Sequence, residues 1–232
     1  MIKIKYQLEI PGSNISTKVS DFVYSIIRKN IINWNIKPGV LMSEKEVSKQ
    51  INVSRTPVRE AFIKLKREGL VEILPQRGTV VSKIDLKRVE EERFIRACIE
   101  VAVFNIAMDN FPSELLPIIE KNLKCQQECI ENIDYKRFIK LDEEFHRIIY
   151  SSCKKEMCWE VIQTVSSHYK RIRVMTLWDK DILRNLIEQH SAMFDSIRKK
   201  DRNKAELTIK KHLEKLLFEE DEMKRKYPEY FR

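Results

Sequence analysis

The chain has 232 residues, of which 43% are hydrophobic and 34% are charged, enough for one or two domains with real cores. It contains no run of 18 apolar residues and no signal-peptide pattern, so a cytoplasmic protein without a membrane span is expected. The five cysteines are odd in number and form no CxxC motif, which favours reduced core cysteines.

The net charge of +9 is unevenly distributed along the chain. Residues 1–84 hold 15 lysines and arginines against 7 acidic residues, whereas residues 85–232 hold 29 against 28. A basic front half and a near-neutral back half suggest a module that binds a polyanion, joined to a partner domain. Taken alone, the asymmetry is equally compatible with an ordinary solvated surface.

The first predicted element is a helix from Lys18 to Ile32, in which the apolar residues recur on one face. The sequence Lys37-Pro38-Gly39 ends this pattern. A second helix is expected to follow Ser43, because Ser43 and Glu46 have the N-cap and N3 spacing of a capping box.

A third predicted helix begins within the stretch VSRTPVREAF, which starts at Val53. Ser54 is a suitable N-cap, and Pro57 is tolerated in the first turn because the N–H groups there have no partner within the helix. One face is apolar and consists of Val58, Ala61, Phe62 and Leu65. The opposite face carries Arg55, Thr56, Arg59 and Lys66. An exposed cationic helix start can present arginines to guanine edges and phosphates, although an isolated basic helix is more often simply solvated.

The second and third helices, joined by a tight turn, have the helix-turn-helix arrangement. Gly69 ends the third helix. Two β-rich runs, Val71–Leu74 and Thr79–Ser82, then flank the turn Pro75-Gln76-Arg77-Gly78 and predict a hairpin. A hairpin with an arginine at its tip, beside a recognition helix, is a wing that can reach the adjacent minor groove or phosphates.

The run SEKEVSKQINVSRTPVREAFIKLKREGLVEILPQRGTVV resembles the winged helix-turn-helix of GntR-family bacterial transcription regulators, and the resemblance covers residues 15–84. It implies DNA contacts from Lys45, Ser54, Arg55, Thr56, Arg59, Arg77 and Gly78. The family usually has arginine where this chain has Lys45. Because lysine is a point charge without a bidentate fork, Lys45 is expected to contact a phosphate rather than read a base.

The sequence from Asp85 onward is almost entirely helical in pattern. Breaks fall near residues 110–112, 132–134, 151–155, 178–181 and 200–203. They predict an all-α bundle of six helices, or seven if the first is broken, with antiparallel neighbours. The expected protein is therefore mostly α-helical, with an N-terminal arm (1–14), a winged helix-turn-helix (15–84) and a helical effector-binding domain (85–232).

Three of the four histidines, His146, His190 and His212, continue the apolar stripes of three separate predicted helices. Asp142 lies four residues before His146, so the two share a helix face. A lone histidine on an apolar face is usually a hydrogen-bonded core residue, but three of them with a carboxylate can all be satisfied by one metal ion. Such ligands suit Zn, Ni, Co or Mn. The fourth, His168, is expected in the core or lining a pocket, on a face with Val161, Val165 and Ile172.

The segments DEEFHRIIYSSC, EQHSAMFDSI and KKHLEKLL resemble the FCD effector domain of the FadR subfamily of GntR regulators, over about residues 86–223. The resemblance implies a divalent metal held by Asp142, His146, His190 and His212, and a small organic acid bound at the metal with the help of arginines. Arg96 is the candidate, because Arg96 and Glu100 match the first effector-domain helix of the family. An ordinary ion pair between these two residues is an equal alternative.

Together these features predict a homodimeric DNA-binding transcription regulator, not an enzyme, in which effector and metal shift the population toward one spacing of the DNA-binding domains. The alternative is a helical metalloenzyme with a catalytic metal bound by three histidines and Asp142. Two points argue against the metalloenzyme. The first domain has no catalytic purpose, and the sequence indicates no general base outside the proposed metal ligands. The sequence does not identify the effector, the metal, the operator, the dimer interface or the sign of regulation.

Overall fold

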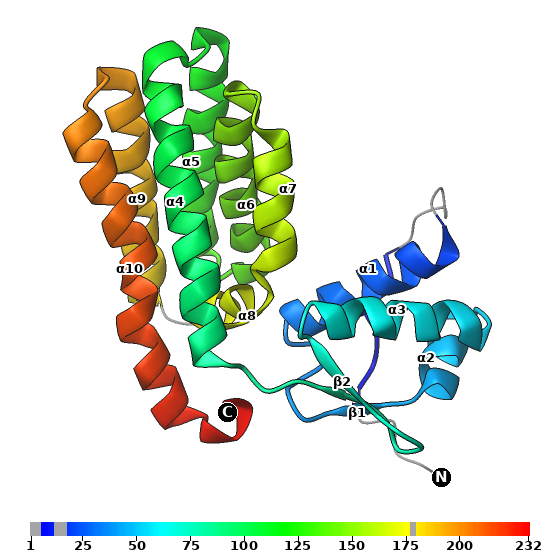
Figure 1. Ribbon diagram of the computed structural model, residues 1–232. Coiled ribbons are helices and arrows are strands. Elements are labelled where there is room, and N and C mark those ends of the chain that lie inside the picture. The colour runs from blue at the N-terminus through cyan, green and yellow to red at the C-terminus, as the bar shows by residue number, and fades with distance from the viewer. Residues whose placement is uncertain (1–5, 12–17, 177–179) are drawn as a thin grey trace. The chain divides into compact units, whose positions relative to one another are not determined.

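The computed structural model describes the backbone of residues 6–11, 18–176 and 180–232, and the side chains of these residues apart from 180 and 214–220. Contacts divide the chain into two compact units (Figure 1). The first unit comprises Met1–Val89, Ser167–Val174 and Lys224–Arg232, and the second comprises Glu90–Ser166 and Met175–Met223. Residues 178 and 179 of the predicted break at 178–181, and parts of the predicted arm, fall outside the described residues.

Three helices open the first unit: α1 (Val19–Ile32), α2 (Glu44–Ile51) and α3 (Arg55–Arg67). The predicted cap of α2 is confirmed, because the Ser43 side chain accepts a hydrogen bond from the Glu46 N–H at 3.1 Å. Such a bond satisfies one of the N–H groups that have no partner in the first turn of a helix.

The start of α3 differs from the prediction in one detail. Ser54 occupies the N-cap position with extended backbone, but its hydroxyl makes no capping hydrogen bond to the described residues. The turn before it is made by Asn52, whose φ of 59° lies in the left-handed region that asparagine tolerates. The Ser54 hydroxyl is therefore left on the exposed side of the turn.

The predicted hairpin is confirmed and forms part of a three-stranded antiparallel sheet, in the order β1-β3-β2. Its strands are β1 (Leu41–Met42), β2 (Val71–Leu74) and β3 (Gly78–Val81). Gly78 has a φ of 117°, and a Cβ there would lie 2.9 Å from the Met42 carbonyl oxygen. Glycine at this position thus lets the first and third strands approach.

The core of the first unit is built by the predicted apolar faces of the helices, including Val58, Ala61, Phe62 and Leu65. Tyr6 and Leu8, from the segment before α1, belong to the same core. The Leu8 N–H donates to the Gln50 side chain at 2.9 Å. Residues 6–11 therefore include part of the core that supports the helix-turn-helix.

Two segments far along the chain complete the first unit. One is α8 (Ser167–Thr176), where the Arg171 carbonyl accepts a 2.7 Å hydrogen bond from the Trp34 indole and its guanidinium donates to the Ser82 carbonyl at 2.7 Å. The other is the C-terminal end, which follows the short helix Pro228–Tyr230 and joins Ile84 through a parallel bridge at Phe231. The fold of this unit therefore depends on residues well beyond the winged helix.

The fourth histidine is buried, as predicted, but it lies at the start of α8 and does not continue a face of the preceding helix. The helix before it, α7 (Glu156–Val165), ends at Val165, so His168 does not continue the stripe of Val161 and Val165. Its Nδ1 accepts from the Asp85 N–H at 3.1 Å, and its Nε2 lies 3.1 Å from the Gly69 carbonyl oxygen. Since Nδ1 is the acceptor, Nε2 carries the proton and donates to that carbonyl.

We expect His168 to make the first unit less stable in acid. Burial, followed by the positive charges of Arg171 and Arg88, lowers the pKa of His168 to about 3. An unfolded histidine has a pKa of about 6.5, so between pH 6.5 and 3 the unfolded chain binds a proton that the folded chain does not, and stability falls as pH falls. Between pH 7 and 5.5 this amounts to about 1 kcal/mol.

Urea unfolding of metal-free protein at these two pH values measures the effect. His168→Asn keeps an acceptor for Asp85 and should lose less stability on acidification than the wild type, since the other three histidines are common to both. Equal losses in the two proteins would contradict the assignment.

The second unit is a helical bundle built from six helices, some of which continue into the first unit. They are α4 (Leu86–Asn110), α5 (Leu116–Glu131), α6 (Tyr135–Ser152), α7, α9 (Lys180–Lys199) and α10 (Arg202–Lys226). Helix α5 follows the short helix Ser113–Leu115 and packs against α6 and α9. With α8, the described chain after residue 85 has seven α-helices, and the extra break falls at Ser166 instead of within the first of them. No helix of the described residues is long and apolar enough to cross a membrane.

Candidate nucleic-acid interface and metal centre

The exposed side of the helix-turn-helix carries the residues predicted to meet DNA. Helix α3 turns its apolar face into the core, which leaves the start of the helix accessible (Figure 1). Six of the seven predicted residues are exposed and the seventh, Gly78, is half-buried. The exposed six are Lys45, Ser54, Arg55, Thr56, Arg59 and Arg77. Four of them are cations, as a surface that faces phosphates requires.

Arg59 is held by a two-pronged ion pair with Glu44 at the start of α2. Its Nε and one terminal nitrogen donate to the two carboxylate oxygens at 2.8 and 2.9 Å. This hydrogen bonding holds the pKa of the Glu44 carboxyl below its usual value. The Arg59 side chain remains 67% exposed, so the pair orients the guanidinium and leaves it accessible to a ligand.

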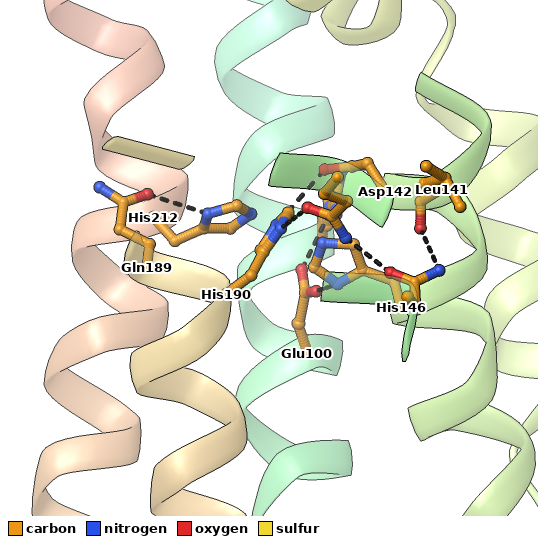
Figure 2. A network of polar contacts seen from close by, with 10 residues as sticks. Glu100, Leu141, Asp142, His146, Gln189, His190 and His212 are labelled. Atoms are coloured by element: carbon orange, nitrogen blue, oxygen red, sulfur yellow. Dashed lines mark hydrogen bonds and ion pairs between the residues drawn. The ribbon is translucent and has the colours of Figure 1, made fainter. Parts of the chain in front are cut away.

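The second half of the protein brings three histidines from three helices together (Figure 2). His146 comes from α6, His190 from α9 and His212 from α10, and all three are buried. One ring nitrogen from each histidine lies within 4.8 Å of one ring nitrogen from each of the other two. Ligand atoms about 2.1 Å from one ion are separated by about 3–4 Å, so a small side-chain movement would bring all three onto a metal.

Each ring is oriented by an oxygen acceptor at its Nδ1. His190 Nδ1 lies 2.8 Å from the Gln126 amide oxygen, and His212 Nδ1 lies 3.0 Å from the Gln189 amide oxygen. His146 Nδ1 contacts the Glu100 carboxylate. Nδ1–H donates in the two glutamine contacts, and the Glu100 carboxylate lies against Nδ1 of His146, so the Nε2 lone pairs are the ones that face a metal, as in carboxylate–histidine–metal arrangements. His146 Nε2 is buried and has no hydrogen-bond partner among the described residues.

A further chain of hydrogen bonds fixes the Gln126 amide. Its nitrogen donates to the Asn122 side-chain oxygen at 2.7 Å, and the Asn122 nitrogen donates to the Leu141 carbonyl at 3.0 Å. With its nitrogen engaged in this way, Gln126 must present oxygen to His190. The orientation of His190 is therefore determined by two helices, α5 and α6.

Two carboxylates accompany the histidines. Asp142 Oδ1 lies 3.3 Å from His190 Nε2, which places the predicted fourth ligand beside the cluster. Glu100 contacts His146 on one side and receives the Arg96 guanidinium at 2.9 Å on the other. Burial opposes ionisation of Glu100, but the charge of Arg96 and the contact with His146 hold its pKa well below the usual range.

Arg96 is thus part of the buried network that surrounds the histidines, and it forms the ion pair with Glu100 that the spacing allowed. Sequence reasoning did not identify Glu100, Gln126 or Gln189 as partners of the histidines. The signals for Glu100 were its distance of four residues from Arg96 and its match, with Arg96, to the first effector-domain helix of the family. No sequence pattern marked the two glutamines, because a glutamine in a charged helix is usually a surface residue.

The walls of the cluster are aromatic. The Phe145 ring stacks on His190 with 4.6 Å between centroids, and Trp159 lies parallel to His146 at 6.5 Å. The buried Tyr150 hydroxyl, one turn beyond His146 on α6, has no hydrogen-bond partner in the described part of the chain. An apolar surround excludes water from the histidines and strengthens their attraction for a cation. The three histidines and Asp142, together with the side chains that orient the rings, fit a divalent metal ion.

Comparison with known proteins agrees with both halves. Residues 19–81 match the profile of bacterial regulatory proteins of the gntR family, and residues 93–215 match the FCD domain. The chain belongs to the GntR family, with an FCD domain. It is 36% identical over 203 residues to the HTH-type transcriptional repressor RspR of Escherichia coli K12, covering 88% of this chain and 89% of that protein.

A second relative, the Nta operon transcriptional regulator of Aminobacter aminovorans, is 28% identical over 80% of this chain and 89% of its own length. The solved structure of E. coli McbR/YncC has the same fold, with a TM-score of 0.76 and 19% identity over 89% of this chain and 99% of that one. The GntR regulator from Rhodococcus sp. RHA1 gives a TM-score of 0.71 at 22% identity, over 88% and 97%. The chain is therefore a transcription regulator, which confirms the expectation that it is not an enzyme.

Proposed function

We propose that this GntR regulator binds an operator through α2, α3 and the wing, and that a small effector at the histidine cluster changes this binding. The observation that supports the DNA contacts most directly is the exposed cationic start of α3, with Arg59 held in place by Glu44. An arginine fork at the start of a recognition helix suits the O6 and N7 acceptors of guanine. Arg55, Thr56 and Ser54 would share the same groove.

The phosphate contacts are assigned to the edges of this surface. Lys45 is exposed at the start of α2, and Arg77 is exposed at the turn between β2 and β3. As exposed cations at the two edges of the surface, both would contact phosphates and so position the protein on the duplex. Gly78, whose φ of 117° few other residues adopt, keeps the backbone of the wing tip close to Met42 and presents Arg77.

For the effector half, Asp142, His146, His190 and His212 would hold a divalent Zn, Ni, Co or Mn ion. The ion would supply a positive charge that attracts an organic acid. Arg96 supplies a second cation in the same buried network, and the Tyr150 hydroxyl is available to hydrogen-bond the acid. A small carboxylate is the class of effector that this pairing of charges favours.

The effector would act by population shift, because a ligand changes an equilibrium only by its different affinity for the two states. A dimer is required in this scheme, since one winged helix reads one half-site. With chromosomal DNA as its partner, the protein would act in the cytoplasm. The likeness to RspR, named a repressor, favours repression over activation.

Salt dependence tests the DNA half of the proposal. Each protomer offers four cations to the DNA. A plot of the logarithm of the binding constant against the logarithm of the salt concentration should have a slope of about −0.9 for each phosphate neutralised. Operator affinity is therefore expected to fall about 10³- to 10⁵-fold between 50 and 200 mM salt. Fluorescence anisotropy with a labelled operator selected from genomic fragments measures the slope.

Arg77→Ala is the matched variant for this titration. It should reduce the slope by about one for each protomer and weaken binding to operator and random DNA alike. A nearly flat salt titration of the wild type would contradict the proposed surface, and an unchanged slope in Arg77→Ala would remove the wing from it.

A further inference from the structure

A carboxylate lies on the surface that is proposed to meet DNA. Glu44 is the first residue of α2, directly before Lys45, and its side chain is 30% exposed. Hydrogen bonding to Arg59 outweighs the effect of burial and, with the charges of Arg59 and Arg55, holds the pKa of the Glu44 carboxyl below its usual value. Glu44 is therefore ionised at neutral pH. Phosphates repel a carboxylate, so attraction of the DNA backbone does not explain its presence among these cations.

The bond between Glu44 and Arg59 occupies one edge of the guanidinium. The Arg59 Nε and one terminal nitrogen donate to the two carboxylate oxygens at 2.8 and 2.9 Å. The N–H groups that are not bonded to Glu44 belong to the two terminal nitrogens, and these nitrogens form the edge that fits the O6 and N7 acceptors of guanine. Glu44 thus determines which edge of Arg59 is offered to a base.

The pair also removes a net positive charge from the surface. Binding to random DNA comes from cations that displace the counterions of the phosphates. Arg59 beside Glu44 contributes little to such binding, because the two opposite charges largely cancel. On a duplex without the matching guanine, Arg59 finds no bidentate partner and Glu44 brings a negative charge toward the backbone. A repulsive element of this kind selects against wrong partners.

Stabilisation of α2 is the alternative role for Glu44, since an acidic side chain in the first turn interacts favourably with the helix dipole. Asp21 offers a direct comparison. It lies in the first turn of α1, is exposed, and pairs with a cation of α3, Lys64. Lys64 is in the last turn of α3 and is not among the residues predicted to meet DNA. Asp21 and Glu44 therefore share a helical setting and differ in the side chain that each holds.

We propose that Glu44 is a specificity-determining residue for operator binding. By holding one edge of Arg59, it restricts this arginine to reading guanine, and its charge penalises binding to DNA without that guanine. This role deepens the operator contact proposed above for Arg59 and rests on it. An acidic residue would therefore belong to the DNA-binding surface together with the predicted cations.

Glu44→Gln tests this role in the full chain, because it removes the charge and keeps one side-chain oxygen that can accept from Arg59. Each cation freed in this way should add about −0.9 to the slope of the salt dependence, so affinity for random DNA should rise at least about tenfold near 100 mM salt. Operator affinity should change by less than about threefold, since the guanine contact is kept. Fluorescence anisotropy with operator and random duplexes, at several salt concentrations, measures both affinities.

Two further variants separate specificity from net charge and from stability. Asp21→Asn removes the same charge from the first turn of a neighbouring helix and should change neither affinity by more than about twofold. Glu44→Gln/Arg59→Ala should bind random DNA no more tightly than Arg59→Ala does, because the gain requires the freed arginine. Circular dichroism and melting should show that all the variants keep the fold.

The outcomes distinguish this role from the operator contact on which it rests. Wild-type affinity of Glu44→Gln for random DNA, with operator binding lost in Arg59→Ala, would overturn the role of Glu44 and leave the proposed function standing. Equal gains in Glu44→Gln and Asp21→Asn would also overturn it, because the effect would then be one of net charge. Wild-type operator affinity in Arg59→Ala would refute the proposed contact of Arg59, and the role of Glu44 would fall with it.

Discussion

Arg59→Ala should lose operator binding almost completely and keep its fold. Each bidentate arginine–guanine contact contributes roughly ten- to a hundredfold in discrimination, and a dimer would lose two such contacts. Affinity for the operator is therefore expected to fall about a hundredfold or more. Affinity for random DNA should fall far less, because that binding rests on phosphate contacts from the other cations.

The pair with Glu44 does not complicate this experiment. Arg59 is mostly exposed, and solvent screens the attraction between the two charges, so the melting temperature should hardly change. Arg184→Ala provides a matched control, since Arg184 is also an exposed arginine paired with a carboxylate, Asp181, at 2.8 Å. Gel shifts with operator and random DNA compare the three proteins. Wild-type affinity of Arg59→Ala for both DNAs would mean that α3 is not the recognition helix.

The arrangement of the first unit was predictable wherever a local rule decided it. The capping box at Ser43 fixes the start of α2, and the spacing of Val58, Phe62 and Leu65 fixes the buried face of α3. The wing followed from turn residues between two β-rich runs. Strand β1 is only two residues long, so it has no period to detect and depends on pairing with β3.

The position of α8 could not be predicted, because its neighbours are distant in sequence. The pattern from Glu156 to Thr176 is continuous in composition, yet the helix breaks at Ser166 and α8 belongs to the first unit. Hydrogen bonds to Trp34 and Ser82 hold it there, across more than 80 residues of chain. Tertiary contacts of this kind override helical periodicity, which is a local signal.

The sequence predicted which histidines form the cluster, but it did not predict the side chains that accept hydrogen bonds from them. Helical period placed each histidine on an inward face, and their shared need for polar partners favoured one meeting point, which the structure shows. The acceptors that orient them, Glu100 and Gln126 among them, lie on helices whose rotation depends on packing. No pattern in the sequence sets that rotation to the accuracy a hydrogen bond requires.

His190→Ala should remove most of the metal and the response to effector while leaving operator affinity without effector nearly unchanged. An imidazole ligand in an apolar site is poorly replaced by water, so metal affinity is expected to fall more than about a hundredfold. A metal held only by the folded state stabilises it by mass action, by about 4 kcal/mol when the free ion exceeds the dissociation constant a thousandfold. Chelator should therefore lower the melting temperature of the wild type and hardly affect the variant.

Two further variants separate the ligand role of His190 from a general loss of packing. Gln126→Leu removes the acceptor at His190 Nδ1 and keeps the ring, so it should weaken the metal by about ten- to a hundredfold and be rescued by excess ion. His168→Asn alters the histidine of the first unit and should retain full metal content. Elemental analysis, melting with and without chelator, and operator gel shifts measure the four proteins. Equal metal in the wild type and His190→Ala would refute the ligand assignment, whereas loss of metal with an intact effector response would make the ion structural and place the effector elsewhere. If His190 is a metal ligand, metal affinity should fall moderately in Gln126→Leu, where the His190 ring loses its orientation. It should fall further in His190→Ala, where the ring is absent.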